Sequence, residues 1–434
     1  MTYDLRSADY YDQGKLTAEL ERAFGVCHGC RLCHDLCPSF GTLFRRIDEE
    51  DGEVRRLGTT DWNQVTDECY QCKLCFPKCP YTPPHEWRID IPRLLLRSKA
   101  VRVRREGVPL QDRALGKADL IGRLASATAP VSNWALRNPL NRALMEATIG
   151  IHRLRKLPSY ARETFAQWWI RRGGMRPAAP GSPAAAGTEA APPAVALFYT
   201  CAVNYNAPEV GRAAVQVLER NGVAVECPPQ RCCGMPYLYG GDVTNAQRNA
   251  QANVEALLPH VEAGRKVVVP GPTCSYMIKK EYGELLGTEA AKRVAAGTLD
   301  LFEYLASLHR EGRFDTEVAV RPGHIAYHVP CHLKAKNIGF KSRDVLRLVG
   351  AEVTLVDKCC GVDGTWGLKK QYFDESFKIA APALEAFRNA QPAQIVTDCP
   401  LAAIQIEQGT GMKPRHPIEV LAEAYGTTEG GTRP

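Results

Sequence analysis

Eight cysteines near the start of the chain fall into two runs of identical spacing, and they constrain the fold more than any other feature. The runs are CHGCRLCHDLCP (27–38) and CYQCKLCFPKCP (69–80), both of the form C-x2-C-x2-C-x3-C-P. The short gaps place three thiols on one tight loop, so a fourth metal ligand must arrive from another direction. The proline after each run suits a turn of the chain, because it fixes φ and lacks an N–H. Each run therefore predicts most of one metal–thiolate site.

This spacing is that of bacterial ferredoxins, which hold two [4Fe–4S] clusters and in which the last cysteine of each motif ligates the other cluster. Structural zinc more often uses two C-x2-C pairs separated by a longer loop, so the spacing favours iron–sulfur over zinc. The resemblance to these ferredoxins implies two crossed ligand sets. They are Cys27, Cys30, Cys33 and Cys79 for cluster 1, and Cys69, Cys72, Cys75 and Cys37 for cluster 2.

The size of the chain and its other features bound the remaining possibilities. A chain of 434 residues exceeds one typical core, so two or three domains are expected. The first residues are polar and no window reaches about 18 uninterrupted apolar residues, so we expect neither a secretory signal nor a membrane span. The 17 cysteines fit a reducing compartment, which indicates a cytoplasmic protein.

The expected organisation follows from shifts in composition. The stretch 101–174 holds 14 Lys and Arg against 5 Asp and Glu, an excess larger than the +7 of the whole chain. A Gly/Pro/Ala-rich linker follows it. The expected regions are a helical ferredoxin-type domain (1–100), a basic amphipathic helical segment (101–172), the linker (173–194), two repeats (195–320 and 321–426) and a tail (427–434).

The second half of the chain repeats itself, with cysteines after each predicted strand. VALFYTC (195–201) corresponds to GHIAYHVPC (323–331), and KVVVPGPTC (266–274) corresponds to AQIVTDC (393–399). Between them, the doubled cysteines of RCCG (231–234) correspond to those of KCCG (358–361). Strands alternating with helical patterns predict a β-α-β-α-β-α unit with a parallel sheet in each repeat. Such sheets bind ligands beyond the carboxyl ends of their strands, where these cysteines are expected to gather.

These repeats resemble the paired CCG domains of heterodisulfide reductase and of the iron–sulfur subunits of anaerobic glycerol-3-phosphate dehydrogenase and glycolate oxidase. The order of two ferredoxin motifs and two CCG repeats is similar to that of the glycerol-3-phosphate dehydrogenase component and of a second type of heterodisulfide reductase chain. The resemblance implies a multidomain protein: a mostly α-helical dicluster ferredoxin-type domain followed by an α/β pair of CCG repeats with parallel sheets.

The chain departs from the family pattern at one position in each repeat. The family motif closes with C-x-x-C, but Met277 and Ala402 stand where the last cysteine would be. Four thiols per repeat suffice for a further iron–sulfur cluster or for zinc. The predicted metal ligands are Cys201, Cys232, Cys233, Cys274, Cys331, Cys359, Cys360 and Cys399. The seventeenth cysteine, Cys227, is expected to be a bystander, with a replacement ligand or a resolving thiol as alternatives.

Other side chains near the second repeat's cysteines are candidates for chemistry. His328 and His332 flank Cys331 and are candidate proton donors, although hydrogen bonding around the metal ligands is the more ordinary role for them. Asp363, in the GVDGTWG turn (361–367), is a conceivable acid, and Trp366 is expected to shield the site from water.

The sequence predicts an iron–sulfur electron-transfer protein. It has no G-x-G-x-x-G fingerprint after a strand, so the resemblance implies a partner flavoprotein dehydrogenase, with electrons passing through this chain toward quinone or another acceptor. The basic amphipathic segment 101–172 predicts peripheral contact with the inner face of the cytoplasmic membrane; the alternatives are packing against the ferredoxin domain and docking of an acidic partner subunit. Nucleic acid is not an expected partner. The alternatives are a disulfide reductase with its catalytic site in the CCG half, and a non-catalytic redox sensor.

Overall fold

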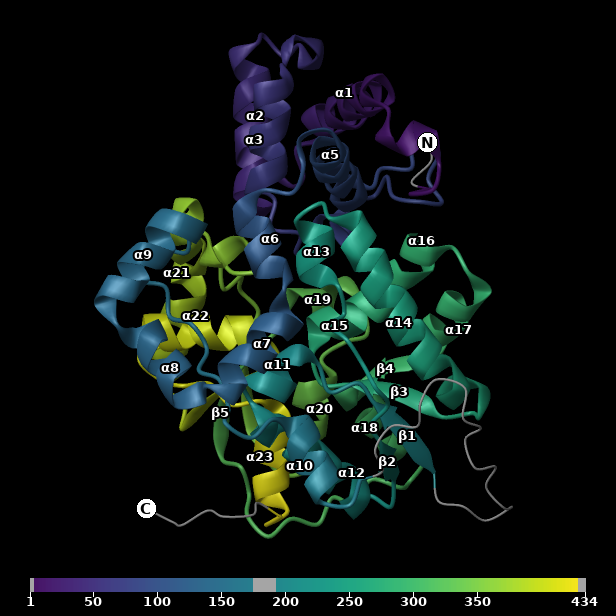
Figure 1. Ribbon diagram of the computed structural model, residues 1–434, viewed down its shortest axis with the longest axis vertical. Helices are drawn as coiled ribbons and strands as arrows, with labels where there is room; N and C mark the ends of the chain where they lie inside the picture. The colour runs from purple at the N-terminus through teal and green to yellow at the C-terminus, as the bar shows by residue number, and fades with distance from the viewer. Residues whose placement is uncertain (1–3, 175–192, 428–434) are drawn as a thin grey trace.

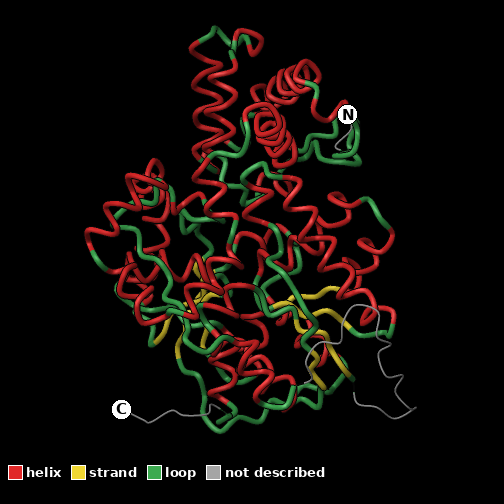
Figure 2. The backbone as a smooth tube through the Cα atoms, in the orientation of Figure 1, coloured by secondary structure: helices red, strands yellow, loops and turns green. Residues whose placement is uncertain are grey.

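The computed structural model describes residues 4–174 and 193–427. A helical N-terminal domain stands above two α/β units, and the strands of those units form two separate groups (Figures 1 and 2). The multidomain fold class predicted from the sequence is confirmed, with a helical region preceding two parallel sheets. Most of the expected linker (173–194) and of the expected tail (427–434) lies outside the described residues.

The N-terminal domain is built from helices around a core of its own. Leu16, Leu20 and Phe24 recur at helical spacing on α1 and are buried against Phe44 and Trp62. The first helix begins after the Asp12 cap and ends where Arg31 adopts the left-handed region. The helices are α1 (Gln13–Cys30), α2 (Pro38–Glu49), α3 (Thr59–Glu68), α4 (Cys75–Lys78) and α5 (Ile91–Glu106). Helices α2 and α3 pack together and project at the top of Figure 1.

The basic segment after this domain is helical and lies against both repeats. Its helices are α6 (Leu110–Gly116), α7 (Ala118–Ala127), α8 (Ala129–Arg137), α9 (Pro139–Ile149) and α10 (Phe165–Arg171). Helix α10 buries Phe165, Trp168 and Trp169 in the core of the first repeat. Arg155 binds Ser376 and Gln405 of the second repeat, and burial lowers the pKa of its guanidinium to about 10. Helix α10 and Arg155 of this segment therefore belong to the protein's packed interior.

The first repeat has a four-stranded parallel sheet in the order β2-β1-β3-β4. Its strands are β1 (Ala194–Leu197), β2 (Ala224–Glu226), β3 (Lys266–Val269) and β4 (Thr298–Asp300). Helices connect and cover these strands. They are α11 (Cys201–Tyr205), α12 (Pro208–Arg220), α13 (Met235–Tyr239), α14 (Val243–Glu262), α15 (Pro272–Tyr276), α16 (Tyr282–Leu286), α17 (Glu289–Gly297) and α18 (Leu301–Arg310), with a π-helical turn at Met277–Glu281. The strand β4 extends the predicted three-strand pattern.

The second repeat has the three-stranded parallel sheet that the sequence predicted, and its strands lie in the order β6-β5-β7. Its strands are β5 (His324–His328), β6 (Glu352–Val356) and β7 (Gln394–Thr397). Its helices are α19 (Cys331–Ala335), α20 (Lys341–Leu348), α21 (Phe373–Ala390), α22 (Pro400–Thr410) and α23 (Pro417–Ala424). Residues of β5 alternate between two hydrophobic clusters, one on each face, as expected of a sheet covered by helices on both sides.

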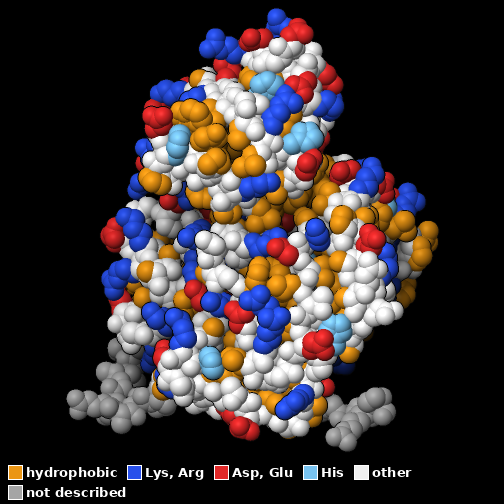
Figure 3. Space-filling view, turned by 180° about the vertical axis from the view of Figure 1, so that it is seen from behind, with side chains coloured by type: hydrophobic (Ala, Val, Ile, Leu, Met, Phe, Trp, Pro, Cys, Tyr) orange, Lys and Arg blue, Asp and Glu red, His pale blue; other side chains and the backbone are white. Residues whose placement is uncertain are grey.

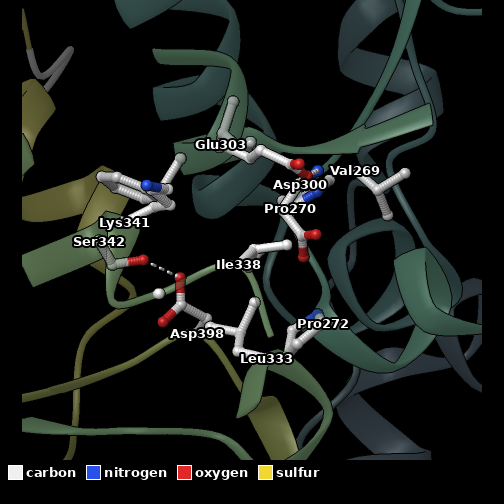
Figure 4. A pocket seen from close by; sticks show the side chains of 13 residues that line it. Val269, Pro270, Pro272, Asp300, Glu303, Leu333, Ile338, Lys341, Ser342 and Asp398 are labelled. Carbon is white, nitrogen blue, oxygen red and sulfur yellow. Dashed lines mark hydrogen bonds between the residues drawn. The ribbon is translucent and has the colours of Figure 1, made fainter. Parts of the chain in front are cut away.

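The two repeats are joined by a buried ion pair. Lys336 of the second repeat binds Asp300, at the carboxyl end of β4, with an Nζ–Oδ1 distance of 2.5 Å, and both side chains are at least nine-tenths buried. The same ammonium group also donates to Ser275. A small cavity beside this pair is lined by both repeats, and Ser342 donates to Asp398 at its edge (Figure 4). None of the residues that line it is a cysteine, so this cavity is separate from the thiol sites.

Candidate metal centres

The thiols predicted for cluster 1 line one cavity of the N-terminal domain. Cys27 and Cys30 lie on the last turns of α1, Cys33 follows on the next loop, and Cys79 caps α4 from the second motif. Burial raises the pKa of the Cys27 thiol, and the nearby thiols of Cys79, Cys33 and Cys30 raise it further. The structure thus places Cys79 with the first motif, as the crossed arrangement requires.

The thiols predicted for cluster 2 also come together, with Cys37 arriving from the first motif. Burial raises the pKa of Cys75, and the neighbouring thiols of Cys72, Cys69 and Cys37 add to the rise. Backbone amides donate to several of these sulfurs, which opposes the rise because such bonds favour a thiolate. Buried sulfurs with amide donors suit a bound metal cluster, whose positive charge replaces the thiol protons.

In the first repeat the four predicted ligands form a closed group at the carboxyl ends of β1, β2 and β3. Their thiols are hydrogen-bonded in series, in the order Cys201, Cys232, Cys233 and Cys274. Asp119, on α7 of the basic segment, accepts a hydrogen bond of 2.6 Å from the backbone N–H of Cys232. Burial raises the pKa of this carboxyl group.

Cys227 and Met277, the two other sulfur-containing residues considered for this site, lie in different places relative to the four thiols. Cys227 is buried in the cluster on one face of the first sheet, beside Val195 and Val268, whereas Cys232 and Cys233 belong to the cluster on the opposite face. This position matches the expected bystander role. Met277 is fully buried in the same cluster as Cys232 and Cys233.

In the second repeat each predicted ligand has a different partner. Cys331 donates to Asp363 over 3.2 Å, Cys359 accepts from the N–H of Gly361 over 3.4 Å, and Cys360 lies 3.7 Å from a backbone carbonyl. Cys399 caps α22 and accepts from the N–H of its third residue over 3.5 Å. The Asp363 carboxylate adds to the pKa rise of all four thiols, and it contacts the thiol of Cys331 directly.

The second repeat touches the cluster 2 thiols directly. Tyr70, Cys72 and Trp366 form one buried hydrophobic cluster, which Cys37, Cys331 and Cys359 border. The Tyr70 hydroxyl and the Cys359 sulfur lie 3.5 Å apart, at hydrogen-bond distance. A Cys359 thiolate could only accept from this hydroxyl, so the bond lowers the pKa of the thiol against the larger effect of burial. The Trp366 indole donates to the carbonyl of Asp67 over 3.0 Å, a second hydrogen bond between the second repeat and the N-terminal domain.

The two candidate histidines have different surroundings. His332 lies between three parts of the protein: its Nε2 is 3.2 Å from the Gln71 carbonyl and 3.1 Å from the Tyr239 hydroxyl, and its Nδ1 is 3.0 Å from Thr273. His328 binds Thr397 of the neighbouring strand over 3.1 Å. Burial lowers the pKa of His332 to about 3 and of His328 to about 4, so both rings are neutral near pH 7. Both therefore lack the proton that a cationic donor would supply.

Only part of the basic amphipathic segment 101–172 is exposed and could contact a membrane. Arg155, Trp168 and Trp169 are buried because they hold the segment against the two repeats. Arg142 is also buried, and it binds backbone carbonyls of the segment itself. The exposed apolar side chains lie mainly on α6 to α9 and the loop that follows, and they are Leu110, Leu120, Ile121, Leu124, Val131, Trp134, Leu140, Leu144 and Leu154, with Ile170 on α10. Helices α8 and α9 form the left edge of Figure 1. No helix within the described ranges has the length and hydrophobicity needed to cross a bilayer.

Two family models match the chain over the regions just described. A model described as a cysteine-rich domain, named CCG, matches residues 195–279 and again 325–407. The Fer4-like domain of citrate utilization protein B matches residues 20–106. The two matches correspond to the two α/β repeats and to the helical domain that carries the eight ferredoxin-type cysteines.

Curated relatives are similar to this chain over most of their own length. A subunit of anaerobic glycerol-3-phosphate dehydrogenase from Escherichia coli K12 is 29% identical over 415 residues, covering 93% of this chain and 99% of the relative. The glycolate oxidase iron–sulfur subunit of the same organism is 24% identical over 433 residues, covering 95% and 97%. Lactate utilization protein A of Geobacillus thermodenitrificans is 32% identical over 187 residues, which is 40% of this chain and 74% of the relative. Together with both family models, these matches show that the chain belongs to the CCG-domain family of iron–sulfur oxidoreductase subunits.

Proposed function

We propose that this chain carries electrons between a partner dehydrogenase and an acceptor, through two [4Fe–4S] clusters and the metal site of the second CCG repeat. The observation that carries the proposal is the shared hydrophobic cluster in which Cys37 and Cys72, from the cluster 2 set, adjoin Cys331 and Cys359. Electron transfer needs redox centres close together in a medium that excludes water, and this contact supplies both.

The donor sets fit the groups that the family implies. Each predicted set contains four thiols, the ligand number and type of a [4Fe–4S] cluster. Most of these thiols have a pKa raised by burial, so they are poorly suited to remain free thiolates without a metal. When bound, the clusters would supply reversible one-electron transfer. The residues of this chain hold them, exclude water and fix the order of the centres.

The order of the relay follows from exposure. The cluster 1 cavity includes Leu32, which is 49% exposed, whereas Cys72 of the cluster 2 set is buried. Figure 3 shows a hydrophobic area flanked by histidines on the N-terminal part of the molecule. We therefore assign cluster 1 as the entry point, cluster 2 as the link, and the second repeat as the next centre.

A flavoprotein dehydrogenase is the proposed donor. The chain has no dinucleotide-binding fingerprint of its own, and its relatives are named as subunits of a dehydrogenase and an oxidase. The wide reach of those matches, over more than nine-tenths of each relative, supports a similar role as one component of a larger enzyme.

The apolar side chains on α6 to α9 support contact with a membrane that holds the quinone acceptor. Arg113, Lys117, Arg123 and Arg137 are exposed in the same segment, and within the described ranges none of them has a carboxylate within ion-pairing distance. Apolar side chains with free basic groups suit an interface with anionic lipid, where each basic residue contributes about 1 kcal/mol. Flotation with anionic vesicles should show binding at low salt and release at high salt. No binding at low salt by cluster-loaded protein contradicts the membrane contact.

The central experiment is cluster counting in ligand variants under anaerobic conditions. The wild-type chain should hold more iron than the roughly eight atoms of two [4Fe–4S] clusters. About eight irons, with zinc or no metal at the CCG repeats, contradicts electron transfer through the second repeat, because zinc has no redox chemistry. Cys79→Ser should alter the electron paramagnetic resonance signal of cluster 1, and Cys37→Ser that of cluster 2. An effect of Cys79→Ser confined to the cluster held by Cys69, Cys72 and Cys75 contradicts the crossed assignment. Fewer than about eight irons in the wild type contradicts the relay itself.

A further inference from the structure

The second repeat contains a buried carboxylate beside one of its thiols. Asp363 is 4% exposed, and its Oδ2 lies 3.2 Å from the Cys331 sulfur and 3.6 Å from Nε2 of His332. One ligand atom from each of these three side chains fits within 4.8 Å of the others. The corresponding position of the first repeat, three residues after its second adjacent cysteine, is Pro236, which offers no ligand atom.

The spacing of Asp363 and Cys331 suits two ligands of one metal. A thiolate about 2.3 Å and a carboxylate oxygen about 2.1 Å from a tetrahedral metal ion lie about 3.5 Å apart. The observed 3.2 Å is close to that separation, so little movement of either side chain is needed. The backbone favours the same position, since the carboxylate also accepts from the N–H of Gly364.

The charges around Asp363 also call for a cation at this place. Binding a metal requires Cys331 to lose the proton that it now donates to Asp363. A thiolate and a carboxylate would then face each other in the interior, an arrangement that is costly without a cation between them. The nearby ammonium group of Lys73 is already paired with Glu281 at 3.2 Å.

His332 is less suited to be that ligand. The Gln71 carbonyl can only accept, so Nε2 carries the hydrogen, and Nδ1 therefore accepts from the Thr273 hydroxyl. Both nitrogens are thus engaged by the ferredoxin domain and the first repeat. His332 holds the parts of the protein together beside Asp363, while the carboxylate contacts the thiol of Cys331.

We propose that Asp363 is an oxygen ligand of the metal group held by Cys331, Cys359, Cys360 and Cys399. It would supply the additional ligand that the second repeat lacks at Ala402, where the family motif has a cysteine. On metal binding the Cys331 proton is released, and Asp363 changes from a hydrogen-bond acceptor to a ligand. The inference rests on the proposed function only in that the second repeat holds a metal group.

The test uses the full chain, reconstituted anaerobically with iron and sulfide, in wild type, Asp363→Ala and Asp363→Cys. Asp363→Ala should weaken metal binding at the second repeat at least tenfold. A loss of about tenfold is the smallest one expected even for a residue that only hydrogen-bonds a metal ligand. Asp363→Cys should restore the metal content and change the Mössbauer spectrum of that iron, because sulfur replaces oxygen. Asp398→Asn is the matched control: this buried carboxyl group adjoins Cys399 but binds Tyr327 and Ser342, and its loss should leave the spectrum unchanged.

The outcomes separate this inference from the proposed function. Metal content and Mössbauer spectrum equal to wild type in both Asp363 variants overturn the ligand assignment and leave the relay standing. If Cys359→Ser holds as much metal as the wild type, the second repeat binds no metal in the wild type. That result overturns both proposals. If Asp363→Ala does not fold, the spectrum of Asp363→Cys decides alone, since an unchanged spectrum excludes an oxygen ligand.

Discussion

In the first repeat Cys201, Cys232, Cys233 and Cys274 are hydrogen-bonded to one another, whereas the four thiols of the second repeat bind other groups. The first group is covered by α7 of the basic segment, which contributes Asp119. The second group faces the ferredoxin domain, which contributes Tyr70 to it. Two copies of one cysteine pattern thus have different neighbours.

The difference teaches that the pattern alone does not define the role of each repeat. Both repeats place cysteines after parallel strands, so both offer four sulfurs to a metal. Only the second repeat shares a hydrophobic cluster with the cluster 2 thiols, and only it carries a carboxylate directly after the doubled cysteines. The first repeat therefore suits a compact closed site, and the second suits an exchange of electrons with its neighbour.

The largest effects are expected from removing one thiol in each repeat. Cys232→Ser and Cys359→Ser should each abolish most metal binding at their own repeat, because a neutral hydroxyl is a much weaker ligand than a thiolate. Only Cys359→Ser should also alter the electron paramagnetic resonance signal of cluster 2, which it adjoins. Metal analysis and spectra of both variants provide the check. Equal effects of the two variants on cluster 2 would refute the proposed asymmetry.

A smaller but still large effect is expected where the repeats meet. Lys336→Met leaves the Asp300 carboxylate buried without its ion-pair partner, and should lower the free energy of unfolding by about 3–5 kcal/mol. Lys334→Met is the matched control, because its partner Asp357 is half exposed and the pair should contribute below about 1 kcal/mol. Denaturant unfolding measures both. A loss as small in Lys336→Met as in the control would show that the repeats are not coupled through this pair.

A graded effect is expected from acid, and it should arise mainly in the second repeat. His328 and His332 have a pKa of about 4 and 3 in the folded protein, against 6.5 when unfolded. Below pH 6.5 the unfolded chain therefore binds protons that the folded protein does not, and each histidine should lower the free energy of unfolding by about 1.4 kcal/mol per pH unit. Unfolding between pH 7 and 5 tests this. His328→Gln should flatten the slope, and an unchanged slope contradicts the assignment.

The smallest effect is expected from one hydroxyl group at the contact with cluster 2. Tyr70→Phe removes the donor to the Cys359 sulfur and should lower the reduction potential of the second repeat's centre by on the order of tens of millivolts, because hydrogen bonds to sulfur favour the reduced state. Tyr282→Phe is the control, since that hydroxyl donates to the carbonyl of Cys233 and not to a sulfur. Redox titration compares them. Equal reduction potentials in Tyr70→Phe and wild type would show that the Tyr70 hydroxyl does not tune the centre of the second repeat.

The cysteine spacing and the strand pattern predicted the fold class because each is a local signal. Apolar runs such as VALF (195–198) end near cysteines in both repeats, and these runs form parallel strands. The strand β4 (Thr298–Asp300) has only three residues, too few for a recognisable pattern, so the sequence gives little sign of it. The positions of the thiols followed from topology, since parallel strands end at one edge of a sheet.

The partners of the thiols were not predictable, because distant parts of the chain supply them. Asp119 lies 113 residues before Cys232, and Tyr70 lies 289 residues before Cys359, so no local pattern joins either pair. Trp168 and Trp169 show a different limit. Tryptophans beside arginines suggested an interface, but amphipathicity does not distinguish a membrane-facing helix from one packed on a core.

The cavity that holds both Cys27 and Cys79 has a consequence for how the protein is made. These residues are about fifty positions apart, with the α2–α3 hairpin between them. A cluster bound by both closes that whole stretch into a loop, and a cross-link of this span stabilises a fold by roughly 4 kcal/mol in the chain-entropy view. The first three cysteines are synthesised before the fourth, so a cluster with this ligand set can be completed only after residue 79 has been added to the chain.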